Sequence, residues 1–117
     1  MAVDWEKFYP IETNPMIHVL ATIEVTPGQR AAFLEQFHWV VPLVRAEEGC
    51  MEYGAAIDVP TLIAVQVPSR PNTVIAVEKW SSVETLQAHL KAPHMAEYRV
   101  RVKDLVTGVT LQVLQPA

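Results

Sequence analysis

The residues most able to do chemistry are concentrated in one stretch, Glu78 to Met95, with the sequence EKWSSVETLQAHLKAPHM. A glutamate, a tryptophan and two histidines lie there within one predicted strand-to-helix corner. An imidazole titrates near neutral pH, so His89 is the first candidate for a general base. The alternative is a partly buried histidine that only hydrogen-bonds to the backbone at a helix end.

Glu78 and Trp80 are two residues apart and are predicted to share one face of a strand. A carboxyl group on an apolar strand face needs a partner and often has a raised pKa. Glu78 therefore either orients a histidine or pairs with an arginine or lysine across the sheet. Trp80 is a candidate to line a pocket, with a plain core position as its alternative.

Four further side chains are candidates for substrate binding. Tyr53 and Tyr98 either donate a hydrogen bond to a substrate oxygen or only satisfy a hydroxyl group in the core. His94 either caps the helix that follows Pro93 or lines the mouth of the pocket. His18 points away from the main apolar face of its strand, which places it at a dimer face or in the pocket.

The sequence predicts neither a metal site nor a bound organic cofactor. His89 and His94 are five residues apart with a proline between them, which differs from the i, i+4 spacing that puts two ligands on one helix face. There is no glycine-rich phosphate loop, and four glycines in all argue against a dinucleotide or flavin site.

Composition narrows the class of protein further. A chain of 117 residues is the size of one domain, and its net charge of -4, without a basic run, argues against a nucleic-acid partner. One cysteine and the lack of a signal-peptide pattern lead us to expect a cytoplasmic protein, and the apolar runs are too short to span a membrane.

Hydrophobic periodicity predicts strands at 16–25, 50–57, 73–80 and 109–114, and helices at 27–47, from Ser82 to Pro93, and from Pro93 to Gly108. This order predicts an α+β, ferredoxin-like fold: a four-stranded antiparallel sheet with helices on one face. Because the strands are apolar on both faces, we expect the bare face to pack against a second copy in a symmetric homodimer.

Four further details complete this prediction. Thr26 is expected to cap the first helix with Pro27 at its first position, and Val83, Leu86 and Leu90 to form the apolar stripe of the second. The proline-rich segment 58–72 is expected to be a loop with a short extra strand, or an arm that reaches across an interface. Residues 1–16 are expected to form an N-terminal arm that precedes a domain at 17–117.

Several short motifs together resemble a known family. They are, in chain order, IHVLA at 17–21, Pro27-Gly28, EEGC at 47–50 with Tyr53 behind it, VEKW at 77–80, AHLKAPHM at 88–95 with Tyr98 just after it, and LQP at 114–116. Over about residues 16–116 the chain resembles the antibiotic biosynthesis monooxygenase (ABM) domain, and in particular the bacterial quinol monooxygenases.

The resemblance implies a dimeric α/β barrel with a pocket between sheet and helices, in which a quinol or polycyclic phenol is oxidised without metal or flavin. It also implies that Trp80 lies near the pocket. Members of the same fold that degrade haem carry a ligating histidine on a helix where this chain has Arg99 or a close neighbour, which argues against haem.

The leading hypothesis is a cofactor-independent monooxygenase that acts on a small aromatic substrate and dioxygen. His89 is the base, Trp80 and Tyr53 line the pocket, and Glu78 orients the histidine. The alternatives are an isomerase of a small metabolite on the same fold, which needs an acid and a base but no oxygen, and a small-molecule-binding domain without catalysis.

Overall fold

The computed structural model describes residues 16–117, so the predicted arm at 1–16 lies outside the described residues except for its last position. The helices and strands are β1 (Ile17–Val25), α1 (Arg30–Arg45), β2 (Cys50–Ala56), β3 (Thr73–Trp80), α2 (Val83–Leu90), α3 (Pro93–Val102) and β4 (Val106–Leu114). No helix in this part of the chain is long and apolar enough to cross a membrane.

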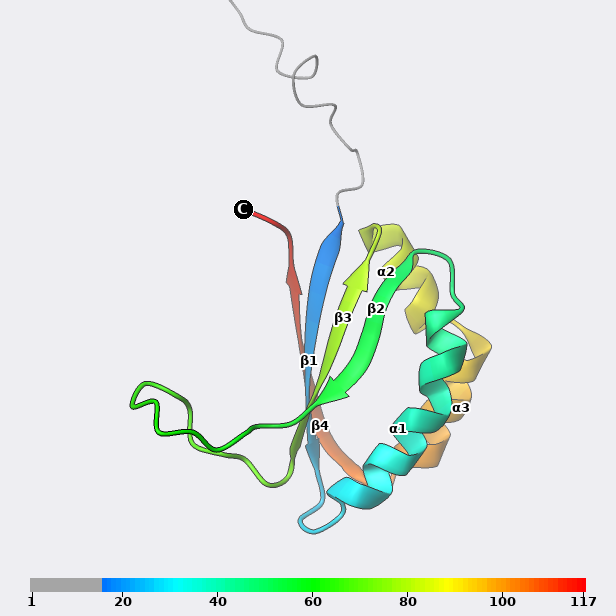
Figure 1. The fold of residues 1–117 in the computed structure, drawn as a ribbon. Coiled ribbons are helices and arrows are strands. Elements are labelled where there is room, and N and C mark those ends of the chain that lie inside the picture. Colours follow the sequence, from blue (N-terminus) through cyan, green and yellow to red (C-terminus); the bar gives the residue numbers. More distant parts are fainter. Residues whose placement is uncertain (1–15) are drawn as a thin grey trace, which may run out of the picture.

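The four strands form one antiparallel sheet in the order β2-β3-β1-β4. Figure 1 shows all three helices together on one side of this sheet. The predicted ferredoxin-like α+β architecture is therefore confirmed.

The core lies between the sheet and the helices. Every second residue of β1, from Ile17 to Val25, is buried under the helices, as its two-residue period predicts. From α1, Phe33 and Phe37 are buried against the same core, with Val40 and Val44 continuing the stripe. The inner face of β3 contributes the buried residues Val74, Ala76, Glu78 and Trp80.

The outer face of the sheet carries partly exposed apolar side chains on its two central strands. Leu20 of β1 pairs with Val77 of β3, and Thr22 with Ile75, so these residues share the face that lies opposite the helices. A homodimer that buries this face stays a prediction.

The first helix begins later than predicted. Its first residue is Arg30 and its N-cap is Gln29, because the backbone N–H of Gln29 bonds to the carbonyl of Thr26 in a tight turn. Gly28 occupies this turn with φ +81°, a conformation that suits glycine. The prediction that Pro27 is the first helical residue was therefore wrong.

Strand β2 contains a bulge that the alternating pattern did not reveal. Cys50 pairs with Trp80 while Glu52 pairs with Lys79, so Met51 is an extra residue. As a result Met51 is exposed, whereas it was predicted to share the face of the buried Tyr53.

In α2 the predicted apolar stripe is wrong at two of its three positions. Leu86 is buried, but Val83 and Leu90 are exposed, and His89 takes the buried position three residues after Leu86. The next helix, α3, starts with Pro93 at its first turn and buries Met95, Tyr98 and Val102. It ends at Val102, so Gly108 lies within β4 and does not close a helix.

The segment 58–72 is a loop without a strand, and Figure 1 shows it projecting from the sheet on the side away from the helices. Its two ends are joined by Arg70, whose Nε and Nη2 donate to the two carboxylate oxygens of Asp58 at 2.8 and 3.0 Å. Its tip exposes Leu62 and Val65 almost completely. The extra strand is not formed, and an arm across an interface stays a prediction.

Candidate active site

A cavity of about 420 Å³ lies between the inner face of the sheet and the helices. Its floor includes Ala21 of β1 and Ala76 of β3, which pair directly across the two central strands. Side chains this small at the centre of a sheet leave room beneath the helices. A mostly apolar cavity with a few converging polar groups is the usual form of a small-molecule site.

Aromatic rings form one wall of the cavity. The ring of Tyr53 stacks on that of Phe37, with centroids 5.4 Å apart and an angle of 9° between the planes. Tyr98 meets the same Phe37 edge-on at 6.3 Å. All three residues line the cavity, so a flat aromatic ligand would meet apolar ring surfaces.

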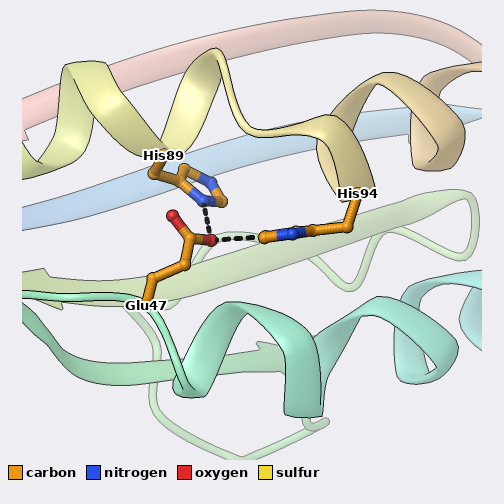
Figure 2. Close-up of side chains that lie close together, drawn as sticks. All are labelled: Glu47, His89 and His94. Atoms are coloured by element: carbon orange, nitrogen blue, oxygen red, sulfur yellow. Dashed lines mark hydrogen bonds and ion pairs between the residues drawn. The ribbon is translucent and has the colours of Figure 1, made fainter.

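His89 also lines the cavity and is held from behind by a glutamate. Its Nδ1 lies 2.8 Å from Oε2 of Glu47, and Nε2 of His94 lies 2.8 Å from the same oxygen. Figure 2 shows the single carboxylate between the two imidazole rings. Because a carboxylate only accepts hydrogen bonds, both ring nitrogens donate to it.

The contact with Glu47 fixes the tautomer of His89. The proton of the neutral ring is on Nδ1, so Nε2 carries the lone pair. Nε2 has no hydrogen-bond partner in the described part of the chain. Every fully enclosed side-chain nitrogen or oxygen there does have a partner, so Nε2 is not fully enclosed. Nε2 therefore remains accessible in a residue that lines the cavity.

The surroundings of His89 favour its neutral form. Burial lowers the pKa of the imidazole below its ordinary value, while the hydrogen bond that His89 donates to Glu47 acts in the opposite direction. The side chain is only 2% exposed. A neutral imidazole with a free Nε2 can accept a proton at pH 7.

Glu78 is the carboxyl group in the cavity wall. Its Oε1 accepts a hydrogen bond from Nε1–H of Trp80 at 2.9 Å. Burial raises the pKa of Glu78 to about 7, the nearby charge of Glu47 adds to this effect, and the bond from Trp80 opposes it. Around neutral pH the carboxyl group can therefore hold a proton or release one.

Trp80 contacts both His89 and Glu78. Its ring is fully buried and packs on the ring of His89, with centroids 4.7 Å apart and planes 34° apart. The same ring donates its N–H to Glu78. Trp80 thus supports His89 and Glu78 from outside the cavity lining.

The hydroxyl groups of Tyr53 and Tyr98 are available to a ligand. Neither has a hydrogen-bond partner among the described residues, and neither is fully enclosed. Burial is the main cause that raises the pKa of both phenols, so both stay protonated and can donate.

Local sequence explains how Glu47 reaches His89. After α1 ends, Cys50 N–H bonds to the carbonyl of Glu47, and Gly49 turns the chain with φ +81°. Ser81 N–H then bonds to the carbonyl of Gly49, which ties this turn to the end of β3. These bonds anchor the turn that carries Glu47 at the corner between β3 and α2, and its carboxylate contacts His89 in the last turn of α2.

Helix α2 is fixed at its N-terminal end by a capping box. The side chain of Ser82 accepts the N–H of Thr85 at 3.1 Å, and Thr85 Oγ1 accepts the N–H of Ser82 at 3.2 Å. With the start of the helix set, Leu86 and His89 both face the core. This arrangement points the imidazole at Glu47 and the cavity.

The structure gathers some of the predicted site residues and separates others. His89, Glu78, Tyr53 and Tyr98 line the cavity. Trp80 and His94 lie behind this lining, and His94 contacts Glu47. His18 lies on the opposite face of the sheet, where it pairs with Lys79, so this chain does not bring it to the cavity.

Glu47 is the residue that sequence reasoning missed. The histidine was predicted to be oriented by Glu78, but Glu78 bonds to Trp80 and Glu47 bonds to His89. Glu47 is 42 positions from His89, and it stands in an EEG sequence that indicates only a helix end. The motif EEGC was noted, yet nothing local to it predicts a partner for a histidine.

One group in the described residues has the donor atoms to hold a metal ion. Glu47, His89 and His94 each offer a ligand atom, and these atoms lie within 4.8 Å of one another. The prediction of no metal site was based only on the spacing of the two histidines along the chain. It did not include a third donor from another part of the chain.

Comparison with known proteins agrees with this architecture. Residues 16–101 match the family model described as antibiotic biosynthesis monooxygenase. Over 103 residues, the chain is 39% identical to the "Probable quinol monooxygenase YgiN" of Escherichia coli K12. The aligned region covers 86% of this chain and 98% of that protein.

Solved structures share the fold. Rv0793 from Mycobacterium tuberculosis aligns with a TM-score of 0.71 at 25% identity, covering 87% of this chain and 95% of that one. PA3566 from Pseudomonas aeruginosa aligns with a TM-score of 0.73 at 21% identity, covering 88% and 95% of the two chains. The match of the family model over most of the chain, together with the identity to YgiN, shows that this protein belongs to the antibiotic biosynthesis monooxygenase family.

Proposed function

We propose that this monooxygenase oxidises a quinol or a related polycyclic phenol with dioxygen, and that His89 is the general base. The observation that carries the proposal is the arrangement of His89 in the cavity wall. Glu47 holds its Nδ1 proton, and its accessible Nε2 belongs to a residue facing an apolar, aromatic-lined space. A base in this position suits removal of a phenolic proton.

The reaction needs no electron donor besides the substrate. Nε2 of His89 takes the phenolic proton, and the electron-rich quinolate gives electrons to dioxygen. The O–O bond breaks, one oxygen atom replaces a hydrogen on a ring carbon, and the other oxygen leaves as water with the hydrogens lost from the quinol. Quinol and dioxygen thus give hydroxyquinone and water, with all four electrons supplied by the quinol.

The remaining cavity residues have separate tasks in this proposal. Glu47 stabilises the imidazolium that forms when His89 is protonated. The hydroxyl groups of Tyr53 and Tyr98, and Glu78 when protonated, can donate hydrogen bonds to developing negative charge on the substrate or on reduced oxygen. The aromatic wall keeps water away from the reacting atoms.

The relative named for quinol oxidation supports the choice of substrate class. The "Probable quinol monooxygenase YgiN" is similar to this chain along almost its whole length. The cavity volume of about 420 Å³ can hold a ring system of one to three rings.

The test is oxygen uptake with a panel of quinols and polycyclic phenols, followed by mass spectrometry of products formed under ¹⁸O₂. We expect one labelled oxygen atom per product, one dioxygen consumed per substrate, and a loss of kcat on the order of 10²-fold or more in His89→Ala. His38→Ala is the matched control, because His38 is an exposed histidine on α1.

Different outcomes lead to different conclusions. Unchanged uptake in His89→Ala would show that the base is another residue. Isomerised product without oxygen consumption would support the isomerase alternative. If no quinol reacts but one raises the melting temperature, the protein binds such compounds without oxidising them.

A further inference from the structure

Three side chains of the types that bind transition metals converge behind the cavity, each from a different element. Glu47 comes from the turn after α1, His89 from α2 and His94 from α3. Figure 2 shows the two rings approaching the carboxylate from separate helices. Two imidazoles and one carboxylate are a common protein ligand set for Zn²⁺, with water completing the coordination.

The carboxylate lies from each imidazole at a distance close to that between ligands of one metal ion, and all three ligand atoms lie within 4.8 Å of one another. Adjacent ligand atoms that lie about 2.0–2.2 Å from one ion are about 2.8–3.1 Å apart in octahedral geometry and about 3.3–3.6 Å apart in tetrahedral geometry. Oε2 of Glu47 is 2.8 Å from a nitrogen of each histidine. His94 is the most exposed of the three side chains, at 22%, so it can rotate and gives an ion a path of entry.

We propose that Glu47, His89 and His94 form a binding site for a divalent transition-metal ion of the Zn²⁺ type. The site uses Nδ1 of His89, Nε2 of His94 and an oxygen of Glu47. The five-residue spacing of the histidines does not prevent this, because Pro93 starts a new helix between them and the third ligand comes from the α1–β2 turn.

The proposed ion would act as an inhibitor of the proposed function. An ion on Nδ1 displaces the proton that this nitrogen donates to Glu47. In a neutral imidazole the proton then sits on Nε2, which becomes a donor and can no longer accept a phenolic proton. This consequence depends on His89 being the base, whereas metal binding itself does not.

Binding is measured on protein freed of metal with a chelator and then dialysed. Zn²⁺ is titrated by calorimetry, and Co²⁺ is added as a spectroscopic probe of coordination. We expect one ion per chain. Ring ¹⁵N resonances of His89 and His94 should shift on Zn²⁺ addition, while those of His18 and His38 should not. This spectrum is recorded on the unaltered chain, so it decides the question even if a variant misfolds.

Variants identify the ligands. His94→Ala and Glu47→Gln should each weaken Zn²⁺ binding at least about tenfold, while His38→Ala binds as tightly as the unaltered chain. Circular dichroism and melting temperature establish that each variant is folded. Absence of saturable binding, or a His94→Ala variant with unchanged affinity, would overturn the proposed site.

Activity provides an independent comparison. If the oxidation is observed, Zn²⁺ should reduce oxygen uptake in proportion to site occupancy, and chelator should restore it. Binding without inhibition would keep the metal site and contradict its link to Nε2. Absence of any oxidation would contradict the proposed function and leave the binding result unaffected.

Discussion

Oε2 of Glu47 lies 2.8 Å from Nδ1 of His89, so a carboxylate from the turn after one helix determines which nitrogen of a buried, cavity-lining histidine carries the proton. The two residues are 42 positions apart, and each depends on its own local structure. A turn with Gly49 fixes the glutamate, and a capping box at Ser82 fixes the helix that carries the histidine. The chemistry of the site depends on both.

Glu47→Gln should lower kcat for oxygen uptake on the order of 10²-fold or more, with a smaller effect on KM. A glutamine amide can donate to Nδ1, which favours the tautomer with its proton on Nε2, and it cannot stabilise an imidazolium by charge. The measurement is steady-state oxygen uptake with a quinol that the unaltered chain oxidises.

The matched control is Glu48→Gln, which removes the charge of the neighbouring exposed glutamate and should leave kcat within about twofold, as expected for a surface change. Equal losses in the two variants would mean that net charge matters and that the contact between Glu47 and His89 does not.

Glu78→Gln should remove one source of pH-dependent stability. The pKa of Glu78 is raised to about 7 from its ordinary 4.5, so the folded state holds this proton more tightly than the unfolded state. The resulting stability is fully present below about pH 4.5 and is lost as pH rises through about 7. The shift corresponds to at most about 3 kcal/mol.

The measurement is urea unfolding of both proteins at several values between pH 4 and pH 8, roughly the range over which Glu78 titrates. The other titratable groups of the chain remain in both proteins, and their contributions largely cancel in the difference. Compared with Glu78→Gln, the unaltered chain should lose stability as pH rises. Parallel pH profiles would show that the pKa of Glu78 is not raised.

The strands and the pairing of Glu78 with Trp80 on one face could be predicted because strand periodicity is local. Residues two apart share a face whatever the rest of the chain does. The same reasoning failed at Met51, because a bulge adds a residue without changing the composition of the strand.

The buried position of His89 could not be read from α2 alone. In an isolated helix an imidazole belongs on the polar side, and Val83 and Leu90 belong in the core. His89 is buried here because Glu47 satisfies its Nδ1 and Trp80 covers its ring. Both partners come from other elements, so only the assembled fold determines which side of α2 faces inward.

Trp80→Phe should destabilise the protein by about 1–3 kcal/mol and more at pH 8 than at pH 5. A phenyl ring can still pack on His89, as the indole does, but Glu78 loses the N–H donor that lies 2.9 Å away. The stability lost is greater when the carboxyl group of Glu78 is ionised. Urea unfolding at both pH values measures the effect.

Trp39→Phe is the control for this change, since Trp39 lies on α1 under the guanidinium of Arg101, and the indole that donates to Glu78 is that of Trp80. The stability lost in Trp39→Phe should not depend on pH between 5 and 8. In a double-mutant cycle, the stability lost through Trp80→Phe should no longer depend on pH when the chain also carries Glu78→Gln. A pH dependence that persists there would assign the effect to another group.

Gly49→Ala should destabilise the protein by about 2–4 kcal/mol, which combines the cost of a left-handed residue with overpacking. Gly49 has φ +81°, and a Cβ there would lie 2.5 Å from Cγ2 of Thr85 and 2.6 Å from Oγ of Ser81. The clash pushes the turn away from α2, so Glu47 should also move away from His89. The measurements are urea unfolding and kcat.

Gly28→Ala separates the two causes, because Gly28 also has φ +81° but a Cβ there would meet nothing within 4 Å. It should cost only about 1 kcal/mol, the penalty for the left-handed conformation alone, and leave kcat unchanged. The excess loss in Gly49→Ala then measures how tightly the turn packs against Thr85. If the two variants are equally stable and equally active, the turn has room to adjust. The position of Glu47 then does not depend on the packing of Gly49 against the start of α2.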